Sequence, residues 1–200
     1  MGITERKQRH KEEIRESIIR AAWNIVQEEG WQALSIRKIA DAIEYSIPVI
    51  YSHYENKDAI LLEFTKKGFH KLNVCLEEAR EQEQNPARQL EKMAQAYWDF
   101  AFRNKEYYQL MYGLGMPTCE TVRQVAELGQ FTQLVQDCIK ALISAGNKNQ
   151  AVDSFLKFHT FWSMLHGLVS INLMSQVCPD NLHQLVLQDA VQGFIKNIEN

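Results

Sequence analysis

The stretch SIRKIADAIEYSIPVIYSHYENK, residues 35–57, decides the fold, because it predicts two short helices joined by a tight turn. Ser35 can cap the first helix, in which isoleucine and alanine recur at helical spacing. Ser46 can cap the second, residues 47 to about 54, where Pro48 is tolerated because first-turn amide groups have no partner within a helix. A helix this short is not stable alone in water and must be held by its neighbours. The stretch therefore predicts a helix-turn-helix whose second helix can enter the major groove of DNA.

The composition of the whole chain indicates an almost wholly helical protein. The chain has 200 residues with four prolines and nine glycines, enough for one large or two small domains with a sizeable core. Apolar residues recur every three or four positions, and no alternating stretch is long enough for a strand. No run of about 18 apolar residues occurs, and no apolar segment follows the basic N-terminus. We therefore expect neither a membrane span nor a signal peptide, and a cytoplasmic location.

The net charge of −3 does not by itself indicate a nucleic-acid partner. A DNA-binding surface must therefore come from a local arrangement of cations. The candidates are Arg6, Lys7, Arg9, Lys11, Arg37, Lys38 and Lys57. The four cysteines stand far apart, without a CxxC pair or Cys/His ligand spacing. We expect reduced, mostly buried thiols, and neither a metal nor a cofactor.

Helical periodicity along the rest of the chain predicts an all-α protein of about nine helices. The polar segment that ends at Pro86 is the best domain boundary, because a proline fits the first turn of a new helix. We expect a DNA-binding domain at residues 1–56, a connecting helix from 57 to about 80, and a larger ligand-binding and dimerisation domain at residues 86–200. The other expected helices span residues 9–29, 89–103, 106–113, 118–145, 150–177 and 181–198.

Residues 11–70 resemble the N-terminal domain of the TetR family of bacterial transcriptional regulators. The motifs that carry the resemblance are EEG at residues 28–30, SIRKIADAI at 35–43, SIPVIYSHY at 46–54, and Lys57. Farther along, YQLMY at residues 108–112 and WSMLHG at 162–167 resemble one branch of the same family, which carries a Trp…His-Gly signature. The resemblance implies a three-helix DNA-binding bundle followed by a helical ligand-binding domain.

Two residues depart from the family pattern. The family usually has glycine in the turn between the two short helices, where this chain has Glu44. It often has a lysine or similar polar residue just after the second cap, where this chain has Ile47. Glu44 would adopt a left-handed or strained backbone at some energetic cost. We expect both residues to affect DNA affinity or operator preference rather than the fold.

Ten residues are candidates for contact with DNA. Ser35 can present its hydroxyl and the first-turn amide groups to a phosphate, and Arg37 can neutralise one. On the second short helix, Ile47 and Val49 can touch thymine methyl groups, and Ser52 can reach base edges. The resemblance implies phosphate contacts for Tyr51, His53 and Lys57, although Tyr51 and His53 can instead simply cover the edge of the bundle. The full set is Ser35, Arg37, Ser46, Ile47, Pro48, Val49, Tyr51, Ser52, His53 and Lys57.

The second half of the chain is rich in aromatic residues spread over four expected helices. An apolar pocket with a few polar tips would suit a small hydrophobic or aromatic effector, although most of these side chains can be ordinary core. His159 and His166 lack a neighbouring carboxylate, which argues against a metal site. The candidate effector-binding residues are Tyr97, Phe100, Tyr108, Met111, Phe131, Phe158, His159, Trp162 and His166.

The last two expected helices carry more apolar surface than one side can bury. Residues 181–198 in particular show two apolar stripes, which is typical of a helix with a partner on each face. We therefore expect a homodimer in which these two helices and their copies form a four-helix bundle on a palindromic operator. The candidate interface residues are Leu168, Ile171, Leu187, Val191, Ile195 and Ile198.

Three functions are compatible with the sequence. The first is a ligand-responsive repressor, in which an effector favours a state with wrongly spaced recognition helices. The second is an enzyme that uses the aromatic cavity, but no nucleophile elbow, HExxH, phosphate loop or paired carboxylates support it. The third is a helical adapter that binds another protein. An exposed cluster of Arg37, Tyr51 and Lys57 would favour DNA, and a buried one would favour the adapter.

Overall fold

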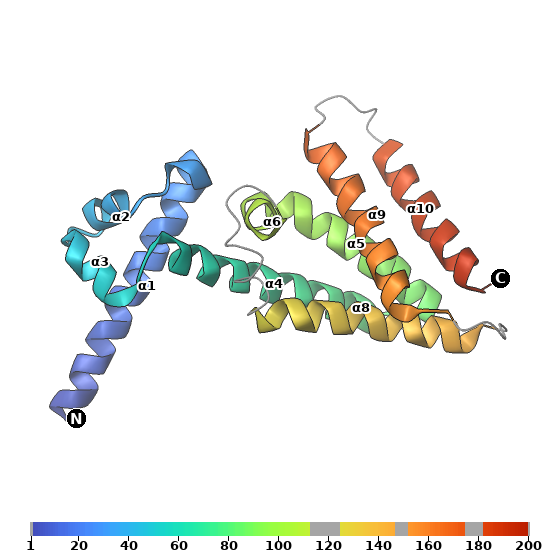
Figure 1. Cartoon of the computed structure of the whole chain (residues 1–200), viewed down its shortest axis with the longest axis horizontal. Coiled ribbons are helices and arrows are strands. Elements are labelled where there is room, and N and C mark those ends of the chain that lie inside the picture. The colour runs from blue at the N-terminus through green and yellow to red at the C-terminus, as the bar shows by residue number, and fades with distance from the viewer. Residues whose placement is uncertain (1, 113–124, 147–151, 175–181, 200) are drawn as a thin grey trace. The chain divides into compact units, whose positions relative to one another are not determined.

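The computed structural model describes residues 2–112, 125–146, 152–174 and 182–199, and these fold into helices α1 to α6 and α8 to α10 (Figure 1). The helices are α1 (Ile3–Glu29), α2 (Ile36–Ala42), α3 (Ile47–His53), α4 (Lys57–Glu81), α5 (Pro86–Arg103), α6 (Lys105–Tyr112), α8 (Ala126–Ala145), α9 (Ser154–Met174) and α10 (Leu182–Glu199). The described residues contain no strand, which confirms the predicted all-α class. Parts of four predicted helices lie outside the described residues, namely residues 113, 118–124, 150–151, 175–177 and 181.

The chain divides into two compact units. The N-terminal unit holds residues 1–65 and 106–124, and the C-terminal unit holds residues 66–105 and 125–200. The division differs from the sequence-based one, because α6 packs with the DNA-binding helices rather than with the second half. None of the helices formed by the described residues is long and apolar enough to cross a membrane.

The core of the N-terminal unit holds the two short helices in place. Ile18, Ala22 and Val26 of α1 are buried, and so are Ile39 of α2 and Ile50 of α3. The predicted cap at Ser35 is confirmed, because its side chain accepts a hydrogen bond from the Lys38 amide at 3.2 Å. Ser46 stands at the cap position of α3, but its side chain makes no capping bond, so that part of the prediction was wrong.

Aromatic contacts attach α6 to this core. The Trp23 ring stacks on the Tyr107 ring at 4.3 Å and on the Phe64 ring at 5.6 Å between centroids. The Trp31 indole N–H donates a hydrogen bond to the main-chain oxygen of Glu106 at 2.7 Å. Gly30, which ends α1, has φ 82° and ψ 170°, a region of backbone conformation open essentially to glycine alone.

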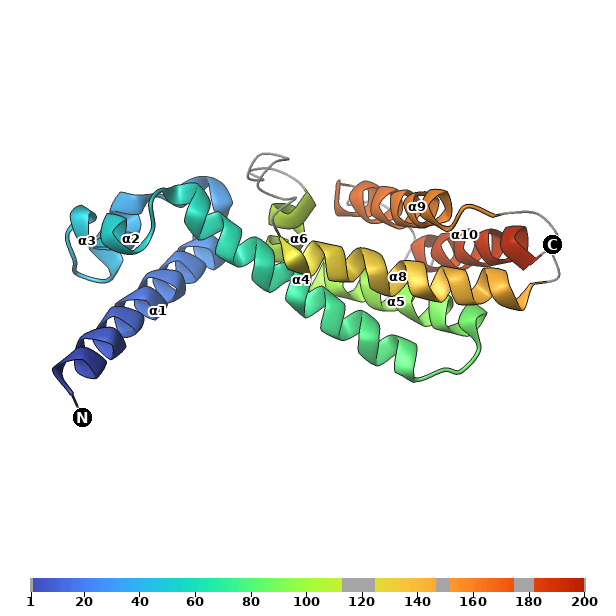
Figure 2. The ribbon, with the colours of Figure 1, turned by 60° about the horizontal axis from the view of Figure 1, so that its bottom comes forward.

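The C-terminal unit is a bundle in which α5, α8, α9 and α10 pack against one another (Figure 2). Asn85 caps α5 by accepting hydrogen bonds from the Ala87 and Arg88 amides, and Pro86 opens the helix as predicted. Burial raises the pKa of the Cys138 thiol to about 12, so this cysteine is protonated and behaves as a small apolar residue. Cys75 is a free thiol as well, and Cys119 and Cys178 lie outside the described residues.

Glu44 has φ 58°, which confirms the left-handed backbone expected in the turn between α2 and α3. Such a conformation costs an L-residue with a side chain roughly 1–2 kcal/mol, more than the entropic cost of a glycine. We expect E44G to raise the free energy of unfolding by about 0.5–1 kcal/mol in urea titrations, because glycine adopts this backbone without strain.

Two variants control for other causes. E44A removes the carboxylate but keeps the strain, so it should give no gain. A42G places a glycine in the exposed last turn of α2, where it should cost about 1 kcal/mol. A gain for E44A equal to that for E44G would assign the effect to charge and contradict the strain.

Candidate nucleic-acid interface and effector site

The helix-turn-helix presents most of its predicted DNA-contact residues to solvent. Arg37, Ser46, Ile47, Pro48, Tyr51 and Ser52 are exposed, and Ser35, Val49, His53 and Lys57 are half-buried. Ile50, on the opposite face of α3, and Tyr54, the residue that follows the helix, are buried. The predicted division of α3 into an inner and an outer face is therefore the one that the structure has.

Three cations, Arg37 and Lys38 of α2 and Lys57 of α4, flank α3 and differ in their partners within the protein. The Arg37 side chain is 83% exposed and approaches Asp41 only to 4.0 Å. Such a surface pair contributes little to stability, so a phosphate can replace the carboxylate as partner. Lys38, which sequence analysis named only as a general cation, bonds to Glu29 at 2.6 Å. Lys57 begins α4, whose first turn is capped by the Asn56 side chain accepting from the Ala59 amide.

His53 and Tyr54 join the end of α3 to α1. The Arg15 guanidinium lies 5.0 Å from the centre of the Tyr54 ring and pairs with Glu63 at 3.3 Å. Burial lowers the pKa of His53, and the positive charges of Lys11 and Arg15 lower it further. The imidazole is therefore neutral at pH 7, and it can accept or donate a hydrogen bond but carries no charge toward DNA in the free protein.

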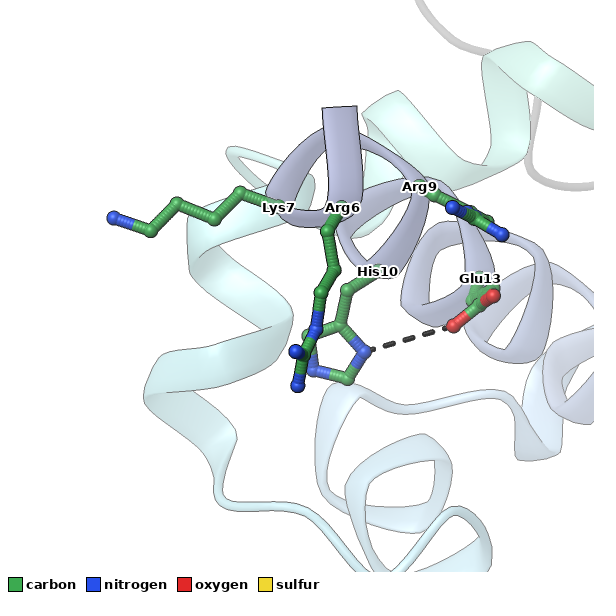
Figure 3. A pocket seen from close by; sticks show the side chains of 5 residues that line it. All are labelled: Arg6, Lys7, Arg9, His10 and Glu13. Carbon is green, nitrogen blue, oxygen red and sulfur yellow. Dashed lines mark ion pairs between the residues drawn. The ribbon is translucent and has the colours of Figure 1, made fainter. Parts of the chain in front are cut away.

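The first turns of α1 display four basic residues that the sequence offered as candidate cations of a DNA-binding surface but that are not among the ten predicted DNA-contact residues. Residues 4–13 are exposed all round and carry four cations against three carboxylates. Figure 3 shows Arg6, Lys7, Arg9 and His10 around a shallow hollow on this helix, with His10 Nδ1 lying 3.6 Å from Glu13. The cluster of basic residues was visible in the sequence, but the helix predicted there began only at residue 9. In the structure α1 begins at Ile3 and carries the whole cluster.

An apolar cavity lies inside the C-terminal unit. Its lining includes three predicted effector residues, Tyr97, Phe131 and Trp162, and its volume of about 10 Å³ leaves room for no more than one water molecule. Ligand sites for small molecules usually measure about 300–1,000 Å³, so in this structure the cavity is closed to a ligand of that size. The complete lining is Leu76, Met93, Tyr97, Phe131, Val135, Phe161, Trp162 and Leu165.

The other predicted effector residues do not line this cavity. Phe100 is buried in the C-terminal unit, and Phe158 is buried with its ring 5.9 Å from that of Phe131. His166 stacks on Trp162 at 5.8 Å, and burial lowers its pKa, whereas His159 is exposed. Tyr108 and Met111 are buried in the N-terminal unit as part of α6.

The predicted dimer surface needs a correction. Leu187, Val191, Ile195 and Ile198 of α10 are buried inside the protomer itself, because α10 packs on α5, α8 and α9. Ile171 is exposed and Leu168 is half-buried. The apolar side chains that α9 and α10 leave exposed are Phe155, Leu156, Ile171, Leu182, Leu185 and Val186.

Two family models match the chain. Residues 18–64 match "Bacterial regulatory proteins, tetR family", and residues 90–189 match "Tetracyclin repressor-like, C-terminal domain". The chain is 25% identical over 187 residues to the HTH-type transcriptional activator FasR of Mycolicibacterium smegmatis, a match that covers 93% of this chain and 81% of FasR.

Solved structures share the fold. The transcriptional regulator FadR from Bacillus subtilis, solved in complex with stearoyl-CoA, has a TM-score of 0.71 at 19% identity and covers 88% of this chain and 97% of its own. The TetR family transcriptional regulator PfmR from Thermus thermophilus has a TM-score of 0.65 at 19% identity, with 90% and 97% covered.

Operator DNA, a small-molecule effector and a second copy of the chain, the three partners predicted from the sequence, are those of this family. The chain therefore belongs to the TetR family of bacterial transcriptional regulators and is a DNA-binding, ligand-responsive protein.

Proposed function

We propose that the chain is a dimeric cytoplasmic repressor that binds a palindromic operator and is released by a hydrophobic effector. The observation that carries the proposal is the outer face of α3, exposed between Arg37 and Lys57 and held from behind by Ile50 and Tyr54. That arrangement suits insertion into the major groove with cations on the flanking phosphates. Of the three residues whose exposure would favour DNA over a protein-binding adapter, Arg37 and Tyr51 are exposed and Lys57 is half-buried, which supports DNA as the partner.

The effector class is supported by the lining of the closed cavity. Eight side chains converge there without a charged group among them, which fits a hydrocarbon chain better than a polar metabolite. The related FadR structure contains stearoyl-CoA. We therefore propose a long-chain fatty acyl thioester, which must push the lining apart to enter and thereby favours a different conformation of the protein.

A catalytic role has less support than a regulatory one. His166 Nε2 lies 3.4 Å from the Ser170 hydroxyl, but the two residues are four apart on α9, a common local contact along a helix. Among the described residues, no three His, Cys, Asp or Glu side chains are grouped closely enough to hold a metal ion. We propose that the chain acts by binding alone.

For the dimer, we propose that the exposed apolar faces of α9 and α10 pack on their copies. Leu185 and Ile171 are each about three-fifths exposed, far more than large apolar residues inside a core. Pairing these faces would give the four-helix arrangement expected from the sequence, but with α10 turned so that Leu182, Leu185 and Val186 point outward.

The DNA contacts can be tested by salt dependence. The probe is a labelled duplex of the promoter beside the gene for this protein, and binding is followed by fluorescence anisotropy. We expect R37Q and K57Q each to weaken binding and to reduce the slope of log affinity against log salt by about 1, because each loses one phosphate contact.

The matched control is K140Q, which removes an exposed cation of α8 that pairs with Asp137 at 3.7 Å. Its salt slope should equal that of the wild type. Equal slopes for R37Q, K57Q and K140Q would contradict the proposed interface, and an absence of sequence-dependent binding by the wild type would overturn the function.

The lowered pKa of His53 predicts opposite pH effects on stability and on DNA affinity. On acidification His53 is protonated at a higher pH in the unfolded chain than in the folded protein. The contribution of neutral His53 to the free energy of unfolding is therefore complete above about pH 6.5 and is lost as pH falls through the folded pKa. A phosphate beside the ring favours the protonated form, so affinity should rise as pH falls from about 7.5 to about 5.5.

The variant H53Q should lose the part of both trends that comes from this imidazole. Anisotropy titrations at constant ionic strength and urea unfolding over the same pH range measure the two effects. If wild type and H53Q gain affinity equally on acidification, His53 does not contact a phosphate.

The effector is tested with stearoyl-CoA added to the protein–DNA complex, with free coenzyme A as the negative control. We expect stearoyl-CoA to lower DNA affinity by about tenfold or more, within the usual range of allosteric coupling. V135F should keep DNA binding and lose this response, because the larger ring fills the cavity that the acyl chain would enter.

Overpacking costs about 1–3 kcal/mol, so the thermal midpoint of V135F is measured alongside. V74F, at an exposed position of α4, is the control and should respond like the wild type. A full response from V135F would place the effector elsewhere. A rise in the DNA affinity of the wild type on addition of stearoyl-CoA would show that the acyl thioester promotes DNA binding and does not release it.

A further inference from the structure

The surface of α3 that faces outward has an unusual composition for a helix that recognises bases. The segment Tyr45–His53, YSIPVIYSH, contains no Arg, Lys, Asn, Gln, Asp or Glu. These six residue types make most hydrogen bonds to base edges in the major groove. Recognition through this segment therefore has to use hydroxyl groups, an imidazole or hydrocarbon.

The polar groups of the segment are only partly available. The Ser52 hydroxyl donates a hydrogen bond to the main-chain oxygen of Val49 at 2.7 Å, so its proton is already engaged. His53 is half-buried at the end of the helix, toward α1. Ser46 remains as an exposed hydroxyl, because its side chain makes no capping bond.

The rest of the exposed surface of this segment consists of hydrocarbon and the hydroxyl groups of two tyrosines. Tyr45 is 42% exposed, Ile47 40% and Tyr51 51%, and these three are the exposed large apolar residues among the described residues of the N-terminal unit. A cluster of this kind on an otherwise polar surface marks a contact site. Arg37 and Lys57 stand on the neighbouring α2 and α4, which favours a polyanionic partner that also offers apolar groups.

We propose that α3 reads its operator chiefly through the methyl groups of thymine, with Ile47 as the residue that determines specificity. Thymine is the one DNA base with a methyl group in the major groove. Ile47 stands in the first turn of α3, the part of a recognition helix that contacts base edges, and Tyr51 lies one turn farther along the same face. The inference rests on the proposed DNA binding and adds the chemistry by which the sequence is read.

The test replaces single thymines of the bound duplex by deoxyuridine, which removes one methyl group and keeps base pairing. The probe is the promoter duplex used above, trimmed to the segment that the protein protects from nuclease. At one or two thymines in each half-site we expect the wild type to lose about three- to fourfold in affinity for each methyl group removed. Substitutions outside the protected segment should have no effect.

A double-mutant cycle assigns the methyl group to a side chain. I47A should bind the thymine and deoxyuridine duplexes equally at the position that Ile47 contacts, because its side chain no longer reaches the methyl group. V74A, which shortens an exposed apolar residue of the same 40% exposure in the C-terminal unit, should keep the discrimination of the wild type. If I47A binds too weakly to measure, I47V replaces it and should show a reduced difference.

The possible outcomes separate this inference from the proposed function. Wild-type protein that binds the promoter duplex but treats thymine and deoxyuridine alike at every position would overturn methyl readout and leave the DNA-binding function intact. Discrimination that persists in full in I47A would overturn the assignment to Ile47. A wild type that binds no duplex in a sequence-dependent way would overturn the function and the inference together.

Discussion

The DNA-binding surface depends on the side-chain contacts that keep α3, a helix of seven residues, folded at the protein surface. α3 is too short to be stable alone in water, and its stability must come from the side chains that it buries. Ile50 is fully buried, and Tyr54 lies buried beneath the Arg15 guanidinium of α1. With the inner face fixed in this way, the outer residues need no structural role. They can therefore carry Ile47 and Tyr51, which a self-supporting surface helix would seldom expose.

Most of the fold could be predicted from local signals. Ser35 and Pro86 mark helix boundaries that the structure reproduces within a few residues, because caps act within one or two turns. Periodicity places the end of the first helix at residue 29 correctly, but α1 begins at Ile3, six residues before the predicted start. The strained backbone at Glu44 was predictable for the same reason, since a tight turn demands a positive φ at that position whichever residue occupies it.

Features that depend on contacts distant in the sequence were not predictable. Leu187 and Val191 form a regular apolar stripe, but periodicity alone cannot say whether a stripe faces its own bundle or a second copy. For the same reason an aromatic-rich half does not reveal which rings meet at a cavity: Tyr97, Phe131 and Trp162 do so, whereas Phe100 is buried without lining it.

Because α6 belongs to the N-terminal unit, it limits which segments related regulators can exchange by recombination. The DNA-reading unit is assembled from two separate stretches of the chain, joined by the stack of Trp23 on Tyr107 and the bond from Trp31 to the Glu106 main chain. A recombination that transferred residues 1–65 alone would leave Trp23 and Trp31 without these contacts. A transplanted reader therefore keeps its fold only if the recipient supplies an aromatic residue and a carbonyl at the matching positions, which limits the regulators between which DNA specificity can be exchanged.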